Sequence, residues 1–276
     1  MPSLECYERS LVFAGWVSIE FGGIALRLNM AMPHERRYLL RHLFGCRYPQ
    51  ADIDTLLFKR YLRQGDVILD AGANIGVTAI EAMNLGAKSV ICVEPEPTLA
   101  SRLRDLNHPG LTIHECALGD RDGDVELFLS TRHNQGHTID PLICEQFQGL
   151  FDGSSVCIQL RTLESVIGDL YCDIWKLDVE GAEVDLVRAS LGLIASRPPR
   201  VIISEIYGER LWSILELLSP RYECKRAFVR KDDYSLDLLS PNLLDYPENY
   251  HLTSPMFVFL DRQALGESPA VSGGAL

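Results

Sequence analysis

Residues Asp70–Gly76 read Asp-Ala-Gly-Ala-Asn-Ile-Gly, a glycine-rich turn that begins with a carboxylate. The turn directly follows the apolar run Val67–Leu69, and a second apolar run ends at Glu94 and Pro95. This pattern predicts a strand, a turn, a helix, and a second strand with an acid at its end. Such a unit is typical of proteins that bind an adenosine-containing ligand, because glycine admits the ligand and the carboxylate accepts hydrogen bonds from ribose.

The residues inside the turn indicate which ligand it binds. A dinucleotide fingerprint starting at Gly72 requires glycines at 74 and 77, where this chain has Asn74 and Val77. The missing glycines therefore disfavour a nicotinamide-dependent oxidoreductase. A tight turn is still sterically possible here, because Asn74 tolerates positive φ. A turn headed by Asp70 suits a cationic ligand, and S-adenosyl-L-methionine (SAM) carries both an ammonium and a sulfonium group.

We therefore expect the residues of this unit to bind SAM. Asp70 would face the methionine ammonium, directly or through water, and Glu94 would accept hydrogen bonds from the ribose hydroxyls. Asn74 would donate to the methionine carboxylate. The remaining contacts predicted here are Gly72, Ala73, Gly76 and Pro95.

Four segments of the chain resemble the FkbM family of SAM-dependent methyltransferases. They are Asp70–Gly76, Glu94-Pro95, Ala117–Asp120 and Lys176–Glu183, of which the last is the most specific to the family. The resemblance covers roughly residues 48–260. It implies an α/β, Rossmann-like class I methyltransferase with a seven-stranded sheet, parallel except for one strand near its edge, and methyl transfer that is usually to a hydroxyl. It also implies that the backbone of Ala117 and Leu118 contacts adenine.

The rest of the pattern predicts the elements that position these residues. Alternating strand-like and helical segments favour a mostly parallel sheet with helices on both faces. Strands are expected near 66–71, 89–94, 111–116, 173–179, 200–206, 222–229 and 255–260, and helices near 76–85, 97–106, 181–193 and 209–218. The interval 120–170 is an addition, with possible strands at 125–129 and 156–160 around a loop at 130–140.

We expect three parts along the chain. Residues 1–50, with a strand pair at 11–21 and 24–28 and a helix at 35–44, would form an N-terminal cap over the active site or a structural extension. Residues 51–262 would form the Rossmann-like methyltransferase domain. Residues 263–276 are rich in Gly, Ser, Pro and Ala and would be disordered.

The catalytic candidates follow from the chemistry of methyl transfer to oxygen, which needs positioned reactants and a base for the hydroxyl proton. Asp178 ends a predicted strand and would contact cofactor or substrate, and His137 is the best histidine candidate for the base. Lys176 lies in an apolar run and would pair with Glu180, Glu205 or another acid, because an unpaired buried charge is costly. Glu180 is a further catalytic candidate. Both Glu180 and Glu183 could instead have a structural role, because acids in the first turn of the next helix complement its dipole.

Three alternatives stay open at this point. Asp178 and Glu205 end neighbouring predicted strands and could hold a magnesium-like ion, but no third acidic ligand is obvious beside Glu205. The methyl group could go to a carboxylate or an amine instead of a hydroxyl. A non-catalytic SAM-binding protein is the alternative from another class.

Composition narrows the partners. The chain has 276 residues and a formal net charge of −12, which disfavours nucleic acid and anionic membranes as partners. Clusters such as Arg36-Arg37 with Arg41 are more typical of solvated faces than of a binding patch. Eight cysteines without a Cys-x-x-Cys pair indicate small buried residues in a reducing compartment. We expect a cytoplasmic enzyme with a small-molecule substrate.

Overall fold

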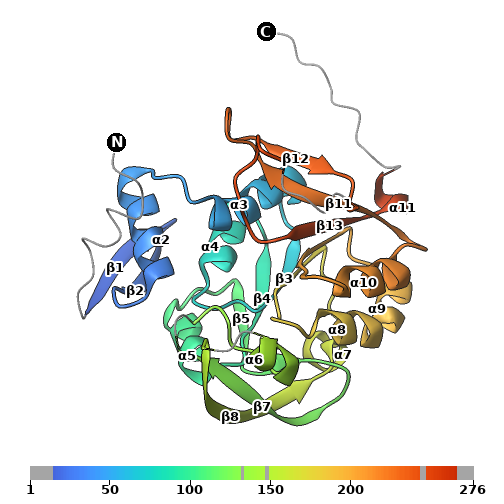
Figure 1. Cartoon of the computed structure of the whole chain (residues 1–276), viewed down its shortest axis with the longest axis horizontal. Helices are drawn as coiled ribbons and strands as arrows, with labels where there is room; N and C mark the ends of the chain where they lie inside the picture. Colours follow the sequence, from blue (N-terminus) through green and yellow to red (C-terminus); the bar gives the residue numbers. More distant parts are fainter. Residues whose placement is uncertain (1–14, 132–133, 147–148, 243–246, 266–276) are drawn as a thin grey trace.

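The computed structural model describes residues 15–131, 134–146, 149–242 and 247–265. Its main feature is a sheet of eight strands (Figure 1). These are β3 (Val67–Ala71), β4 (Ser89–Val93), β5 (Leu111–His114), β9 (Ile174–Leu177), β10 (Val201–Glu205), β11 (Tyr222–Val229), β12 (Leu236–Leu239) and β13 (Met256–Asp261). Their order is β12-β11-β13-β10-β9-β3-β4-β5, and the neighbours from β10 to β5 are parallel. The mostly parallel α/β sheet is therefore confirmed.

The resemblance implied seven strands, whereas the main sheet has eight. β13 is the antiparallel strand that the resemblance implied, and β12 adds a second one by pairing with the outer edge of β11. The sequence of β12 is Leu-Asp-Leu-Leu, which is short and has no β-branched residue. Its strand conformation therefore depends on the neighbouring edge of β11 and left no pattern in the sequence.

Helices cover both faces of this sheet, as Figure 1 shows. Ile68 packs into the hydrophobic cluster on one face and the next residue, Leu69, packs into the cluster on the other. The helices of the first face are α3 (Pro49–Tyr61), α4 (Val77–Asn84) and α5 (Pro97–Asp105), and those of the second are α7 (Leu163–Ile167), α8 (Glu183–Ala189), α9 (Leu191–Ser196) and α10 (Arg210–Leu218). The single helix expected at 181–193 is divided at Ser190, because Ser190 and Gly192 are weak helix formers.

The added interval after β5 forms a second, smaller sheet at the bottom of Figure 1. Its strands are β6 (Ala117–Leu118), β7 (Gly123–Ser130) and β8 (Phe151–Arg161), in the order β6-β8-β7. A helix that the sequence pattern did not predict, α6 (Pro141–Gln146), lies between β7 and β8. Because β6 follows directly from the carboxyl end of β5, this sheet lies beside the edge where a ligand is expected.

The N-terminal segment forms the hairpin β1 (Trp16–Phe21) and β2 (Ile24–Asn29), followed by α2 (Pro33–Phe44). Leu26, Leu28 and Leu39 belong to the same hydrophobic cluster as Ile80 of α4, so this segment is part of the main core. The predicted domain boundary at residue 50 falls in the first turn of α3.

Basic side chains of α2 are used within the fold. Arg36 donates to the carbonyl oxygen of Met30 at 2.6 Å, and Arg41 forms ion pairs with Asp52 and Glu81, both at 2.5 Å. The sequence analysis expected a solvated face here, but Arg36 is buried and both arginines form contacts within the fold.

At the carboxyl end, α11 (Arg262–Leu265) occupies the start of the tail that was expected to be disordered. The remaining tail residues, 266–276, lie outside the described residues. The seven described cysteines are free, and three of them, Cys92, Cys116 and Cys172, are buried. Within the described ranges, helices are too short or too polar to span a bilayer.

Candidate active site

The glycine-rich turn between β3 and α4 has the conformation that its residues permit. Gly72, Asn74 and Gly76 have φ of +82°, +51° and +86°. A Cβ atom on Gly72 would lie 1.9 Å from the backbone oxygen of Asp178, and one on Gly76 would lie 2.7 Å from the side chain of Leu106. Gly72 is therefore required by the packing of the chain itself, a reason that the sequence analysis did not anticipate, whereas Gly76 is favoured mainly by its positive φ because the leucine side chain can move.

A cavity of about 660 Å³ opens at this turn, at the carboxyl edge of the parallel strands. Seven of the predicted cofactor contacts line it: Gly72, Asn74, Glu94, Pro95, Ala117, Leu118 and Asp178. Ala73 lines a neighbouring cavity, whereas Asp70 and Gly76 are in neither lining within the described residues.

Glu94 is the best-defined polar group of this first cavity. Its Oε2 accepts the N–H of Asn74 at 2.8 Å and its Oε1 accepts the N–H of Glu96 at 2.9 Å. Each carboxylate oxygen keeps a second lone pair, so both can still accept from vicinal hydroxyls. Burial raises the pKa of Glu94 to about 7, although the two N–H groups favour the ionised form.

Glu94→Ala is expected to raise the Kd for SAM at least about tenfold, because each lost charge-assisted hydrogen bond is worth about 1.5–3 kcal/mol. Isothermal titration at pH 8 measures this change, with a thermal melt as the control for folding. Ribose hydroxyls bind the ionised carboxylate, so the affinity of the unsubstituted protein should fall as the pH decreases through 7. An unchanged Kd in the variant, or an affinity independent of pH, would remove the ribose assignment.

Lys176 connects the turn to the second strand end. The strand register places it beside Asp70, and its Nζ lies 3.9 Å from Asp70 Oδ1 and 3.2 Å from Asp178 Oδ2. Among the described residues its partners are thus Asp178 and Asp70 rather than Glu180 or Glu205. Burial alone would lower the pKa of Lys176, but the carboxylates of Asp178, Asp54 and Asp70 raise it above its usual value.

Asp70 lies beneath the turn instead of facing the cavity. It is 0% exposed, and neither carboxylate oxygen has a hydrogen-bond partner within the described part of the chain. Burial raises the pKa of Asp70 to about 6, and the ammonium of Lys176 opposes this rise. The direct contact with the methionine ammonium is not supported by this position, whereas a contact through water remains a prediction.

The segment after β9 has an unusual backbone. Glu180 is a non-glycine residue with φ of +48°, and its carbonyl oxygen accepts from the hydroxyl of Thr138 at 2.6 Å. The Glu180 side chain lines the first cavity, where burial and then Asp178 raise its pKa. Glu183 is buried and accepts the N–H of Gly181 at 3.0 Å, so its position fits the structural role at the start of α8.

A second cavity of about 540 Å³ shares Gly72, Asn74, Gln135 and Asp178 with the first. Burial raises the pKa of Asp54 to about 7 and that of Glu205 to about 8, and Asp178 also raises that of Glu205. The hydroxyl of Tyr207 donates to Glu205 Oε1 at 2.5 Å. Five lining residues precede the glycine-rich turn and were not anticipated from the sequence, where no motif marks them: Tyr38, Tyr48, Gln50, Ala51 and Asp54.

His137 lines the first cavity, but its geometry disfavours a role as base. Its Nδ1 accepts the N–H of Ser130 at 3.0 Å, so in the neutral ring the proton is on Nε2. His114 lies in β5, where burial lowers its pKa, and His133 lies outside the described residues. The side chain of Asn74 donates to the carbonyl oxygen of Asn134 at 2.6 Å, which uses one of the two N–H groups expected for the methionine carboxylate.

Asp178 and Glu205 both line the second cavity. In the described ranges, no group of three or more His, Cys, Asp or Glu side chains is arranged to hold a metal ion.

The comparison with known families identifies the chain. The model of the Methyltransferase FkbM domain matches residues 70–227, more than half of the sequence. The chain belongs to the FkbM methyltransferase family. This FkbM protein is thus a SAM-dependent methyltransferase, and its first cavity fits the cofactor through the acceptor oxygens of Glu94 and the apolar walls at Val93, Leu118 and Leu127.

Several solved methyltransferase structures are also similar to this FkbM protein. Precorrin-6y C5,15-methyltransferase from Geobacter metallireducens GS-15 is 16% identical, with a TM-score of 0.41 over 76% of this chain and 86% of that chain. A SAM-dependent methyltransferase from Agrobacterium tumefaciens is 10% identical, with a TM-score of 0.45 over 90% of this chain and 71% of that chain. No curated protein matches the sequence significantly.

Proposed function

We propose that this FkbM methyltransferase transfers the methyl group of SAM to a hydroxyl of a polar small molecule held in the second cavity. The observation that carries this proposal is that the two cavities meet at Asp178. Cofactor in the first cavity and acceptor in the second would thus approach one another beside a carboxylate. Holding two reactants in this way supplies much of the rate in a displacement reaction.

Asp178 acts as the base in this proposal. When bound, SAM supplies an electrophilic methyl group, and the pair of electrons of the broken C–S bond remains on sulfur as the new C–O bond forms. The acceptor hydroxyl loses its proton to the Asp178 carboxylate. Lys176 donates to Asp178 at 3.2 Å and keeps that carboxylate oriented, so Lys176 is a positioning residue.

We assign Glu205 a different role. Burial and then the carboxylate of Asp178 raise its pKa to about 8, which favours the protonated form, and in that form Glu205 would donate a hydrogen bond to the acceptor instead of acting as a base. Glu180 lines the cofactor cavity, and we assign it to the charged end of the cofactor. His137 is the less favoured base, because Ser130 already uses its Nδ1 lone pair.

The N-terminal segment would act as a cap that shapes the acceptor site. Tyr38 of α2 and Tyr48 form part of the wall of the second cavity and lie outside the residues that the family model matches. The net charge of −12 supports a small-molecule acceptor over nucleic acid or an anionic membrane. The free, buried cysteines support activity in the reducing cytoplasm.

The decisive experiment uses SAM with a ¹³C-labelled methyl group and determines which atom of the acceptor receives that group. The purified protein is incubated with matched small molecules that carry a hydroxyl, an amine or a carboxylate, and the product is examined by ¹³C NMR. We expect an O-methyl ether. An N-methyl product would overturn the hydroxyl assignment. It would agree with a cationic amine as the acceptor, because the described lining residues of the second cavity include three carboxyl groups and the single ammonium of Lys176. Failure of every acceptor to release S-adenosylhomocysteine would favour a non-catalytic SAM-binding protein.

Treatment with EDTA is expected to leave the turnover number within about twofold of the untreated enzyme, because the proposed base is a carboxylate and requires no Lewis acid. Initial rates before and after dialysis against the chelator measure this. A complete loss of activity that added Mg²⁺ or Mn²⁺ reverses would instead assign Asp178 and Glu205 to a metal site.

A further inference from the structure

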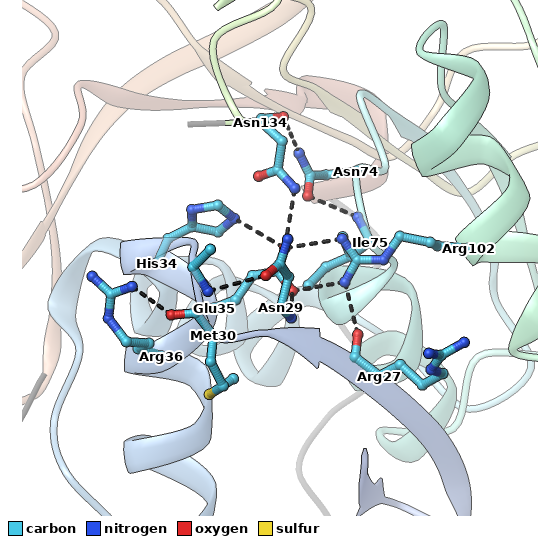
Figure 2. A network of polar contacts seen from close by, with 11 residues as sticks. Arg27, Asn29, Met30, His34, Glu35, Arg36, Asn74, Ile75, Arg102 and Asn134 are labelled. Atoms are coloured by element: carbon cyan, nitrogen blue, oxygen red, sulfur yellow. Dashed lines mark hydrogen bonds and ion pairs between the residues drawn. The ribbon is translucent and has the colours of Figure 1, made fainter. Parts of the chain in front are cut away.

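A buried carboxylate of the N-terminal segment lies at the centre of the polar network in Figure 2. Glu35 of α2 is 0% exposed, and it accepts from both terminal nitrogens of Arg102, at 2.9 and 2.7 Å. Its Oε2 also accepts the N–H of Asn29 at 2.6 Å. A bidentate arginine fixes the plane of a carboxylate, so Glu35 is held rigidly between the hairpin and α5.

This network continues to the cofactor cavity through Asn134. The Nδ2 of Asn134 donates to Glu35 Oε1 at 3.1 Å, and the carbonyl oxygen of Asn134 accepts from Asn74 Nδ2 at 2.6 Å. The N–H of Asn74 in turn donates to Glu94 Oε2 at 2.8 Å. An unbroken row of hydrogen bonds therefore connects Glu35 to the carboxylate assigned to the ribose.

Glu35 also determines the orientation of the Asn134 amide. An ionised carboxylate only accepts hydrogen bonds, so Asn134 must present its NH₂ group to Glu35. Asn134, Gln135 and Asn74 all line the first cavity, whereas Glu35 lines neither cavity in the described part of the chain. Glu35 can thus influence the wall of the cofactor cavity without contacting what binds there.

We propose that Glu35 is a positioning residue for SAM. Through Asn134 it holds the wall at 134–135 and the side chain of Asn74 in the arrangement that accepts the cofactor. The N-terminal segment is thereby required for cofactor affinity, although it lies outside the family match at residues 70–227.

The test measures the Kd for S-adenosylhomocysteine by isothermal titration with the full chain. Asn134→Ala breaks the connection to Glu35 and leaves the buried pair of Glu35 and Arg102 intact. We expect its Kd to rise about tenfold, which corresponds to one hydrogen bond, while its Tm stays within about 2 °C of the parent. Glu35→Gln should raise the Kd by a similar factor and also lower the Tm. The double variant should bind no more weakly than Glu35→Gln, because both substitutions break the same connection.

Asp66→Asn is the matched control for a purely structural role. Asp66 is another buried carboxylate that accepts from an arginine, Arg200, at 2.5 Å, but it precedes β3 at the opposite edge of the sheet. It should lower the Tm and leave the Kd unchanged. A Kd for Asn134→Ala within about twofold of the parent, or effects that multiply in the double variant, would overturn the proposal. If Glu35→Gln fails to fold, Glu35→Asp takes its place, because it keeps the charge opposite Arg102 but withdraws the carboxylate from Asn134. A Kd for Glu35→Asp within about twofold of the parent would also overturn the proposal, and because the measurement needs no acceptor it is independent of the proposed function.

Discussion

Asp178→Asn is expected to lower kcat by about 10²–10⁴, the loss typical of a general base. The amide has the shape of the carboxylate but cannot take the hydroxyl proton. Its oxygen can still accept from Lys176, whose Nζ is 3.2 Å from Asp178 Oδ2, so the fold should persist. Single-turnover rates at saturating SAM measure the chemical step, and titration with S-adenosylhomocysteine shows whether cofactor binding is retained.

His137→Ala is the comparison that separates the two candidate bases. Because His137 Nδ1 already accepts from Ser130, this variant should lose less than about tenfold in kcat. The result that would contradict the assignment is the reverse order, with His137→Ala the more damaging change. A large rise in Kd for Asp178→Asn without a change in kcat would place Asp178 in cofactor binding alone.

The parts of the site that could be predicted from the sequence depend on local chemistry. The turn at Asp70–Gly76 follows an apolar strand, and its glycines and Asn74 are the residue types that tolerate the positive φ observed there. The strand that ends at Glu94 belongs to the same continuous unit, so its acid had to lie beside the turn. For this reason the first cavity contains most of the predicted cofactor contacts.

The parts that could not be predicted depend on strand register and on contacts between distant segments. Lys176 lies beside Asp70 because β3 and β9 pair in one particular register, and a sequence does not state its register. Asp54 reaches the second cavity from α3, and Glu35 reaches Asn134 from α2. No sequence motif marks Asp54, Glu35 or Asn134, because their roles arise only from contacts that form when the chain folds.

The consequence is that the N-terminal segment contributes to both cavities in different ways. It supplies Tyr38 and Tyr48 directly to the second cavity, and it supports the first through Glu35 and Asn134. A fragment that begins at the glycine-rich turn would lack both contributions. The predicted boundary between a cap and a methyltransferase domain therefore does not separate the residues that line the second cavity.

Gly72→Ala is expected to destabilise the protein by about 4 kcal/mol or more, in the range reserved for severe steric conflict. A Cβ atom at residue 72 would lie 1.9 Å from the backbone oxygen of Asp178, and the φ of +82° adds strain for any residue with a side chain. Relief requires movement of the two strand ends that carry Asp70 and Asp178, so SAM affinity should fall together with stability. Urea denaturation and titration with S-adenosylhomocysteine measure the two effects.

Gly65→Ala separates the steric conflict from the backbone strain. Gly65 has a similar φ of +90°, but among the described residues a Cβ atom there would meet nothing within 4 Å. It should therefore cost only about 1 kcal/mol, the penalty of positive φ less the gain from a stiffer unfolded chain. Equal losses at the two positions would mean that φ alone explains Gly72. A much larger loss at Gly72, accompanied by weaker cofactor binding, would show that the contact with Asp178 holds the two strand ends at the distance that the active site requires.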